Sequence, residues 1–427
     1  MSEPTGALDD PTPYAHRRRV MSGRDPDEQG RSATPLELLY DLVFVVAFGV
    51  AAGELAHSLA AGHPAAGLTA FVLCMFAVIW AWVNFTWFAS AFDTNDWLYR
   101  VVSMVQMLGV ALLALGISDV FASIEEGDRL DSDILVIGYV VMRSGLIAQW
   151  VRAYRATADH RTGIRTNITV LLLAQVGWVA AILIAPPLPV ALALAAALFT
   201  VELVGPVAVS RRGGVPWHAH HLAERYGLLA IIALGESIVG TIGAISVLID
   251  SAGWSPDATL LLVCGVGVTF GMWWIYFVLP SGEVLRVHRG RVKVWAYSHI
   301  VLFTAIAAVG AGLHVFAYYL DAEDAEFTVE ISGLGAALSV ALPLAVYNVG
   351  LFGLYAYLVR SVGPLYVQLV LGTAAVLVAG VLLAAAGAPP TWALGVMCLA
   401  PVVMIVGYET REHAHKTSAM RRIHLRR

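Results

Sequence analysis

The sequence predicts an all-α polytopic membrane protein with about twelve transmembrane helices in two parallel six-helix repeats. The composition is strongly apolar, since 59% of the 427 residues are hydrophobic, 13% are charged and the mean hydropathy is +0.74. A soluble domain carries about 25% charged residues. The apolar residues also form long runs, and one of these runs occurs twice. Together these observations exclude a soluble enzyme or nucleic-acid-binding protein.

The long apolar runs match the thickness of a bilayer. A hydrocarbon core about 30 Å thick needs roughly 20 apolar residues in a helix. Segments of this kind occur at residues 35–60, 65–91, 97–120, 133–155, 166–185, 188–209, 221–248, 258–279, 294–319, 332–359, 364–386 and 391–408. The pairs Pro186-Pro187 and Pro389-Pro390 separate neighbouring spans, because proline interrupts a helix.

The basic residues predict the orientation of the spans. Except for Arg129 and Arg143, the 26 Lys and Arg residues fall in or beside the N-terminus, every second loop and the C-terminus. Loops 125–128 and 321–324, on the opposite side, are acidic. Since positive charge resists translocation across the membrane, both termini are expected in the cytoplasm.

The polar ends and the spans define the expected domains. Residues 1–33 are polar and lack the apolar stretch of a signal peptide, so we expect a disordered cytoplasmic tail. Residues 34–210 and 211–408 form the two expected six-helix repeats. Residues 409–427 form a basic cytoplasmic tail.

The first span has a diverged copy in the seventh. Leu36, Tyr40, Leu42, Ala47 and Gly49 recur 186 positions later as Leu222, Tyr226, Leu228, Ala233 and Gly235. Further matches follow in the same order, among them Trp97-Leu98-Tyr99 and Trp295-Ala296-Tyr297, which open the third and ninth spans. Because each half has an even number of spans, both keep the same orientation. This gives a parallel repeat about a pseudo-two-fold axis along the membrane normal.

The first span carries two carboxylates. Glu37 has a structural explanation, because Thr34 as N-cap, Pro35 at the first helical position and Glu37 at the third form a capping box. Asp41 lies one turn further on the same face, beyond the reach of capping. It is expected to face the bundle interior, either as the static partner of a basic residue or as a coordinating group. The sequence leaves both open.

Glu236 is the strongest functional candidate. It stands near the middle of the seventh span, where a charge costs about 2.5–3.5 kcal/mol, and it lies between Gly235 and Ser237. Glycine-interrupted helices at equivalent positions of two repeats are typical of a transporter's central site. The simpler explanation for Gly49 and Gly235 is that they let helices approach closely.

Arg143 falls near the middle of the fourth span and therefore needs an acidic partner. Asp41, Glu236 and Glu202 are the candidates, and the sequence does not decide among them. The pair is either purely structural or part of a site. Asn348, the repeat equivalent of Arg143, is uncharged, so the two halves are not expected to be functionally symmetric.

No metal site, cofactor or enzymatic activity is predicted. The run His218-Ala219-His220-His221 with Glu224 contains metal-binding residue types, but interfacial packing and headgroup contact explain it more simply. A nucleotide-binding loop, a catalytic triad and the HExxH pattern of metalloproteases are absent from the sequence. Catalytic residues are therefore not expected.

Two segments resemble the motifs of a known family. They are Thr34-Pro35-Leu36-Glu37-Leu38-Leu39-Tyr40-Asp41-Leu42-Val43-Phe44-Val45 and His221-Leu222-Ala223-Glu224-Arg225-Tyr226-Gly227-Leu228, which runs on to Leu234-Gly235-Glu236-Ser237-Ile238. The first resembles the Glu-Leu-aromatic-aromatic-Asp-Leu-Val-Phe-Val motif of the bacterial low-temperature-requirement protein A family. The second resembles the family's His-x-x-Glu-Arg…Leu-Gly-Glu-Ser-Ile motif. Leu39 departs from the usual aromatic residue, and Tyr226 stands where histidine is common.

The resemblance extends over all twelve spans and implies an integral protein of the bacterial inner membrane. The family is linked by name to growth in the cold, and the resemblance implies no defined biochemical activity. A weaker similarity is to potassium channels with two six-span repeats, whose first helices carry an aromatic residue, a Ser and an Asp. Tyr40-Asp41 fits this pattern loosely, whereas the second copy has Tyr226-Gly227 and lacks the acid.

These observations favour a permease-like transporter of a small solute or ion that works by alternating access. Asp41, Glu236 and Arg143 would line or brace a central site between spans one, four and seven, with Ser237 and Asn348 as further candidates. The alternatives are an ion channel and a non-transporting scaffold in cold or envelope stress. The expected partners are the lipid bilayer and an unidentified solute or ion, without nucleic acid. The sequence leaves a homo-oligomer open.

Overall fold

The computed structural model describes residues 18–321, 328–360 and 363–412. Within these residues the regular elements are helices, and twelve spans are long and apolar enough to cross a membrane. The predicted all-α class and number of spans are confirmed. Residues 1–17 and 413–427, which hold much of the two predicted tails, lie outside the described residues.

The first six spans are formed by α1 (Pro35–Ala60), α2 (Pro64–Phe92), α3 (Trp97–Leu115) with α4 (Ile117–Glu126), α5 (Asp133–Ala156), α6 (Arg161–Ile184) and α7 (Leu188–Arg211). The last six are formed by α8 (Ala219–Ala252), α9 (Pro256–Phe277), α11 (Val292–Leu320), α12 (Gly333–Val359), α13 (Pro364–Ala385) and α14 (Pro390–Met397) with α15 (Leu399–Gly407). The short α10 (Ser281–Val287) and η1 (Arg289–Arg291) join α9 to α11, and η2 (Tyr408–Glu412) follows α15.

Local sequence signals explain where the helices begin. Proline occupies the first turn of α1, α2, α9, α13 and α14, where its missing amide hydrogen costs nothing. Side-chain oxygens of Asp96, Ser255 and Ser332 cap α3, α9 and α12 by accepting from backbone amides three residues on. These signals were readable in the sequence, and the predicted starts of these helices agree with the structure within about two residues.

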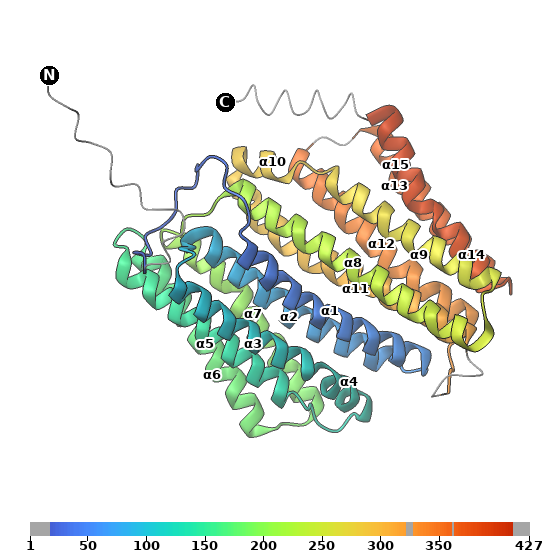
Figure 1. The fold of residues 1–427 in the computed structure, drawn as a ribbon, viewed down its shortest axis with the longest axis horizontal. Helices are drawn as coiled ribbons and strands as arrows, with labels where there is room; N and C mark the ends of the chain where they lie inside the picture. The colour runs from blue at the N-terminus through green and yellow to red at the C-terminus, as the bar shows by residue number, and fades with distance from the viewer. Residues whose placement is uncertain (1–17, 322–327, 361–362, 413–427) are drawn as a thin grey trace, which may run out of the picture.

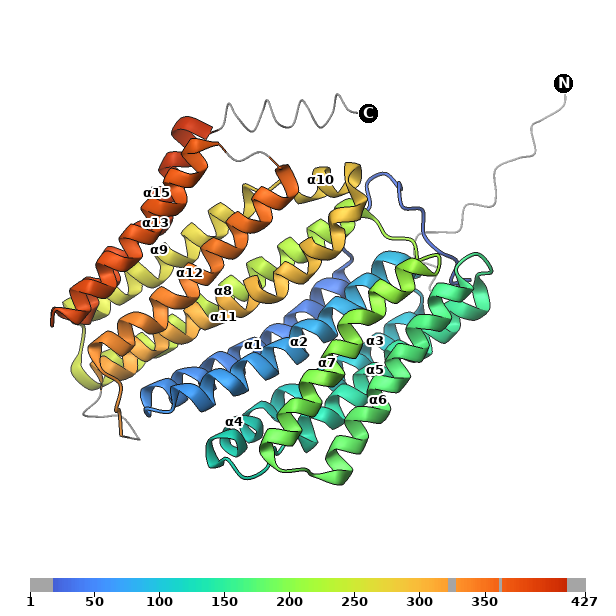
Figure 2. The same ribbon diagram turned by 180° about the vertical axis from the view of Figure 1, so that it is seen from behind.

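The helices form two groups that meet along four central helices (Figure 1). In the middle, α1 and α2 pack against α8 and α11. The helices α3, α5, α6 and α7 lie on one side of these four, and α9, α12, α13 and α15 lie on the other; Figure 2 shows the same arrangement from behind. The start of α1 and the end of α15 lie on the same side of the bundle, which we call the terminal side.

The helices pack in a similar order in the two halves. The extensive pairing of α3 with α5 in the first half corresponds to that of α11 with α12 in the second. The pairs α1–α2 and α6–α7 correspond likewise to α8–α9 and α13–α14. This order favours the predicted six-helix repeat, which stays a prediction.

Glycines bring α3 and α5 into backbone contact. A Cβ atom on Gly109 would overlap the backbone of Gly138 and Met142, and one on Gly138 would overlap the backbone of Gly109 and Leu113. Gly116 approaches the backbone of Leu135 in the same way, at the point where the third span bends from α3 into α4. Small residues allow such close approach between membrane helices.

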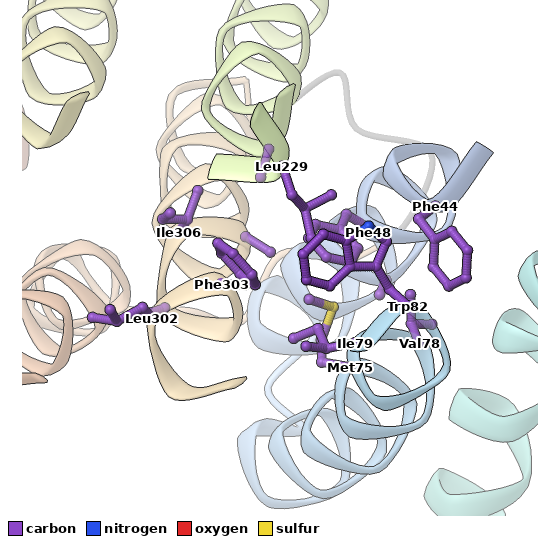
Figure 3. Close-up of a cluster of buried hydrophobic side chains, with 14 of the residues drawn as sticks. Phe44, Phe48, Met75, Val78, Ile79, Trp82, Leu229, Leu302, Phe303 and Ile306 are labelled. Atoms are coloured by element: carbon purple, nitrogen blue, oxygen red, sulfur yellow. The ribbon is translucent and has the colours of Figure 1, made fainter. Parts of the chain in front are cut away.

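Apolar side chains fill the space where the four central helices meet. Figure 3 shows a cluster with Phe44, Phe48, Met75, Val78, Ile79, Trp82, Leu229, Leu302, Phe303 and Ile306. All ten are at most 1% exposed, and four of them, Phe44, Phe48, Leu229 and Phe303, are called the apolar layer here. Along α1 this layer begins directly after Asp41, and along α8 it lies between Arg225 and Glu236.

The described part of the N-terminal tail contacts the bundle, and the disorder expected of the tail stays a prediction. Residues 18–33 pack on the terminal side of the bundle, where Met21 is buried. The Arg31 guanidinium donates to the carbonyl oxygens of Ala89 and Ser90 at 2.9 and 2.7 Å. These carbonyls belong to the last turn of α2, where the Ala89 oxygen also accepts from the amide of the C-cap residue Asp93 at 3.1 Å, and carbonyls at a helix C-terminus attract a nearby arginine.

Candidate functional site

The predicted capping box is present at the start of α1. The Glu37 amide donates to the Thr34 hydroxyl at 3.3 Å, and the Thr34 amide donates to Glu37 Oε2 at 2.8 Å. Glu37 is nevertheless fully buried. Its other carboxylate oxygen, Oε1, faces α8, so capping accounts for only half of this side chain.

Arg225 of α8 binds both carboxylates of α1. Its Nη1 lies 2.7 Å from Glu37 Oε1 and its Nη2 lies 2.5 Å from Asp41 Oδ1. All three side chains have no exposed surface. The spacing of the two acids permits this geometry, because residues four apart share one helix face and can meet a single guanidinium on the facing helix.

Two further side chains complete this cluster. His221 Nε2 lies 3.2 Å from Glu37 Oε1, and Trp82 Nε1 donates to Asp41 Oδ1 at 2.7 Å. His221 and Arg225 lie one turn apart on α8, whereas Trp82 comes from α2. We call Glu37, Asp41, Trp82, His221 and Arg225 the ion network.

The charges of the ion network do not balance without a proton. Two ionised carboxylates and one guanidinium leave one negative charge, which a proton on His221 or on a carboxyl group would neutralise. Asp41 Oδ2 and His221 Nδ1 are buried and have no hydrogen-bond partner among the described residues. Because an uncompensated buried charge is costly, this arrangement is suited to holding a proton.

Arg143 lies in a separate cluster. Its Nη2 is 2.5 Å from Glu202 Oε2 of α7, and the same guanidinium contacts the hydroxyl of Tyr139. The Tyr139 hydroxyl and Trp178 Nε1 also donate to Glu202, at 2.8 and 3.1 Å. Of the three partners that the sequence left open, the structure therefore selects Glu202. The expected joint site of Arg143 with Asp41 and Glu236 does not form, because Arg143 faces α7 instead of the central helices.

Glu236 lies alone beyond the apolar layer, about 16 Å along α8 from Arg225 at 1.5 Å per residue. It is half-buried and borders a cavity of about 20 Å³ together with Gly49, Gly240 and His314. This space holds about one water molecule. Among the described residues, we find no ion-pair or hydrogen-bond partner for its carboxylate.

The glycines around Glu236 differ in their roles. A Cβ atom on Gly49 would overlap the Glu236 carboxylate, and one on Gly240 would overlap the His314 ring. Gly235 has open space at the equivalent place, so close packing does not explain it. Thus only Gly49, of the two glycines singled out from the sequence, makes a close approach.

Of the remaining predicted residues, Ser237 lines the small cavity beside Glu236, whereas Asn348 is not among the residues that line it. The Ser237 hydroxyl lies 3.4 Å from the carbonyl oxygens of Ala233 and Ile306, so it is engaged with backbone. Asn348 is buried in α12, where its Nδ2 has no hydrogen-bond partner among the described residues. Glu224 accepts from the Ala33 amide at 3.1 Å and thereby ties the N-terminal segment to α8.

The histidines before α8 have structural contacts. His218 Nδ1 caps α8 by accepting from the His221 amide at 3.1 Å, and His218 Nε2 lies 2.8 Å from the Glu28 carbonyl oxygen. Within the described ranges, no three His, Cys, Asp or Glu side chains are grouped as metal ligands. These contacts agree with the interfacial packing that the sequence suggested.

Sequence reasoning missed Arg225 as the partner of Asp41. The charge pattern groups Arg225 with the basic residues that flank the membrane, although it lies one turn inside the seventh span. The available signal was its position four residues after His221, on one face of the helix whose copy carries Glu37 and Asp41. Trp82 gave no signal beyond its place in a tryptophan-rich span.

The bundle and its buried ion pairs define a multi-pass α-helical membrane protein whose two motif-bearing helices are joined by charge. The family model described as bacterial low temperature requirement A protein (LtrA) matches residues 32–401, and the chain belongs to this family. It is also similar to an uncharacterized protein of Rhizobium meliloti (strain 1021), with 28% identity over 265 residues. That match spans 60% of each chain.

Proposed function

We propose that the protein is a permease-like transporter in which Glu236 binds the coupling proton. The observation that carries this proposal is the isolated Glu236 carboxylate, half-buried near mid-membrane beside a water-sized cavity. Ionised carboxylates inside a membrane are costly, and they mark proton relays and ion pathways in many transporters. A purely structural acid would be expected to have a basic partner, as Asp41 and Glu202 do.

The arrangement of polar groups along α1 and α8 supports the same proposal. The ion network lies toward the terminal side, and Glu236 lies on the other side of the apolar layer. In this conformation Phe44, Phe48 and Leu229 separate the two polar levels. Alternating access requires a closed barrier of this kind on one side of a central site at any time. An ion channel would instead require a continuous pore between α1 and α8.

The test is proton movement in proteoliposomes that contain a pH-sensitive dye. A panel of cations, anions, amino acids and sugars is added outside in the presence of an imposed pH gradient. We expect one class to cause proton movement with the native chain and none with Glu236→Gln. The matched control is Glu54→Gln, because the Glu54 carboxylate on α1 already accepts a hydrogen bond from the Ser118 hydroxyl. Equal flux through Glu236→Gln and the native chain would exclude the coupling role.

A scaffold without transport activity is the second candidate, favoured by the Arg143 cluster. Arg143 is fully buried and already paired with Glu202, as expected of a charge that only holds α5 against α7. A folded native chain that moves no member of the panel would support this candidate. Under either proposal we assign no enzymatic activity. The partners are the bilayer and, for the transporter, an unidentified solute or ion.

A further inference from the structure

The segment before α1 crosses the terminal side of the bundle and contacts both halves of the chain. We call residues 18–33 the strap. In the first half, the Arg24 amide donates to the Ala91 carbonyl oxygen, in the last turn of α2, at 2.9 Å. In the second half, the Glu28 carbonyl oxygen meets the ring of His218, directly before α8. The strap therefore joins the two halves outside the membrane spans.

His218 lies where the strap, α2 and α8 meet, and it is 5% exposed. Its amide donates to the Ser90 hydroxyl of α2 at 3.1 Å. Its Nδ1 accepts from the His221 amide of α8 at 3.1 Å, and its Nε2 lies 2.8 Å from the Glu28 carbonyl oxygen. The ring of this one residue thus connects the strap to the first turn of α8.

The partners of the His218 ring determine its protonation state. A carbonyl oxygen can only accept, so Nε2 carries a hydrogen, whereas a backbone amide can only donate, so Nδ1 carries none. The arrangement therefore requires the neutral imidazole. On protonation, Nδ1 would gain a hydrogen that points at the His221 amide. Two donors would then face each other, and the cap of α8 would be lost.

The surroundings of His218 also disfavour a charged ring. His218 is the N-cap of α8, a helix of 34 residues whose N-terminal end carries a partial positive charge. Burial lowers the pKa of His218, and the positive charges of Arg31 and His220 act in the same direction; the contact with Glu28 opposes them without outweighing them. Charged or titratable groups on the elements packed around the ring are Arg24, Glu28 and Arg31 of the strap, Asp93 at the end of α2, His220 and His221 of α8, and Arg289 of η1.

We propose that His218 is a pH-sensitive link between the strap and α8, closed when the ring is neutral and opened at Nδ1 when the ring gains a proton. The side chain of His221 also contacts Glu37 in the ion network. Opening the first turn of α8 therefore bears on the contact between α1 and α8, so acid on the terminal side loosens the junction of the two halves there. This proposal does not rest on the transport function.

The test is hydrogen–deuterium exchange of the full chain in detergent, measured by mass spectrometry from pH 5 to 8. Dividing each rate by the chemical exchange rate at the same pH gives the opening of the first turns of α8 in a peptide that covers residues 219–226. We expect this opening in the native chain to increase as pH falls below about 6.5, with a slope that approaches about one proton. A peptide of α2 that covers residues 74–83 should not change.

Two substitutions separate the two hydrogen bonds of the ring. The side-chain oxygen of asparagine can replace Nδ1, so His218→Asn should keep the first turn of α8 closed at every pH, while the strap, which loses its contact at Glu28, exchanges faster. The side-chain amide of glutamine can replace Nε2 but leaves the cap empty, so His218→Gln should open the turn about fivefold at every pH. His63→Asn is the matched control with a native pH profile, because His63 is the N-cap of α2 but makes no capping hydrogen bond.

Asp93 lies beside the strap and titrates in the same range of pH, so Asp93→Asn is measured in parallel. A pH profile that persists in Asp93→Asn and is lost in His218→Asn would support the link. A profile that persists in His218→Asn, or one that Asp93→Asn abolishes, would overturn the proposal. An opening of α8 that is equal from pH 5 to 8 in the native chain would do the same.

Discussion

At the scale of single residues, Arg225 explains why two motifs distant in the sequence belong together. Glu37 and Asp41 lie in the first motif, and His221 and Arg225 lie in the second. The guanidinium binds both acids in a region without exposed surface. Each of the two acids would be costly in a membrane if it were unpaired. Paired with Arg225, they hold the first half of the chain against the second.

Removing Arg225 should strongly destabilise the bundle. Arg225→Gln leaves two buried carboxylates without their cation, and loss of one partner of a buried pair costs about 3–5 kcal/mol. We expect a large fall in the midpoint of thermal unfolding, measured in detergent by tryptophan fluorescence. The exposed Arg100→Gln variant should unfold like the native chain.

Neutralising the acids should recover part of this loss. In the triple variant Arg225→Gln, Glu37→Gln and Asp41→Asn, no buried charge is left unpaired. The midpoint should therefore rise above that of Arg225→Gln alone. A triple variant less stable than the single one would show that packing, not charge, dominates at this position.

Asp93 should make the stability depend on pH between about pH 4 and 6. This residue caps the end of α2 outside the membrane span, and burial, together with the negative charge of Glu37, raises the pKa of Asp93 to about 6. The unfolded value is about 3.9. The folded state therefore binds the proton of Asp93 more tightly than the unfolded state does. The resulting contribution of Asp93 to the free energy of unfolding is full below about pH 4 and is lost as pH rises through about 6.

The variant Asp93→Asn resembles the neutral acid and keeps an oxygen to accept from the Asn95 amide, which donates to Asp93 at 2.8 Å. Well above pH 6 it should be more stable than the native chain by about 3 kcal/mol. Unfolding midpoints from pH 4 to 8 test this, with the exposed Asp27→Asn as control. Parallel curves for the native chain and Asp93→Asn would contradict the prediction.

At the scale of elements, close backbone contact holds α3 to α5. Gly109 in α3 and Gly116 directly after α3 are seven residues apart, and Gly138 and Gly145 have the same spacing on α5. Each of these glycines faces the other helix, where a Cβ atom would overlap either backbone or the Gln106 side chain. The two helices can therefore pack without intervening side chains, as membrane helices often do.

Adding one methyl group at Gly138 should separate these helices. Gly138→Ala must displace the backbone of α3, since the atoms in its way are the Gly109 oxygen and the Leu113 amide nitrogen. Overpacking of this kind typically costs about 1–3 kcal/mol. Gly53→Ala on α1 is the matched control, because open space surrounds that position. If both variants unfold at the same temperature, the contact does not stabilise the bundle.

The helices were predictable from the sequence, whereas the pairing of their polar groups was not. Apolar runs, prolines and N-caps are local signals, so the spans and the capping box of Glu37 follow from a few adjacent residues. The partner of Arg143 depends on which face of α5 meets α7, and this rotation is set by packing over the whole bundle. The same holds for Arg225, whose distance to Asp41 depends on how closely α1 and α8 approach.

At the scale of the whole molecule, the buried charges lie in two places. Some lie where the first six spans contact the last six, and the others lie within the first six spans. The ion network joins α1 to α8, and the Arg143 cluster joins α5 to α7. Glu236 lies on the half-to-half contact beside Gly49. A movement of one half relative to the other would thus alter the surroundings of Glu236. The same movement would leave the Arg143 cluster intact, because both helices that form this cluster belong to the first half.

The orientation of the bundle gives the last prediction. The terminal side carries nearly all the described basic residues outside the spans, so we expect it to face the cytoplasm. Asp159→Cys in the α5–α6 loop and Asp128→Cys in the α4–α5 loop place exposed thiols on opposite sides. The native cysteines lie within the spans, and Cys74 and Cys264 are buried. In intact cells, a membrane-impermeant maleimide should label Asp128→Cys at once and Asp159→Cys only after the membrane is opened. The reverse pattern would place the termini outside, and it would show that factors other than the basic residues set the topology.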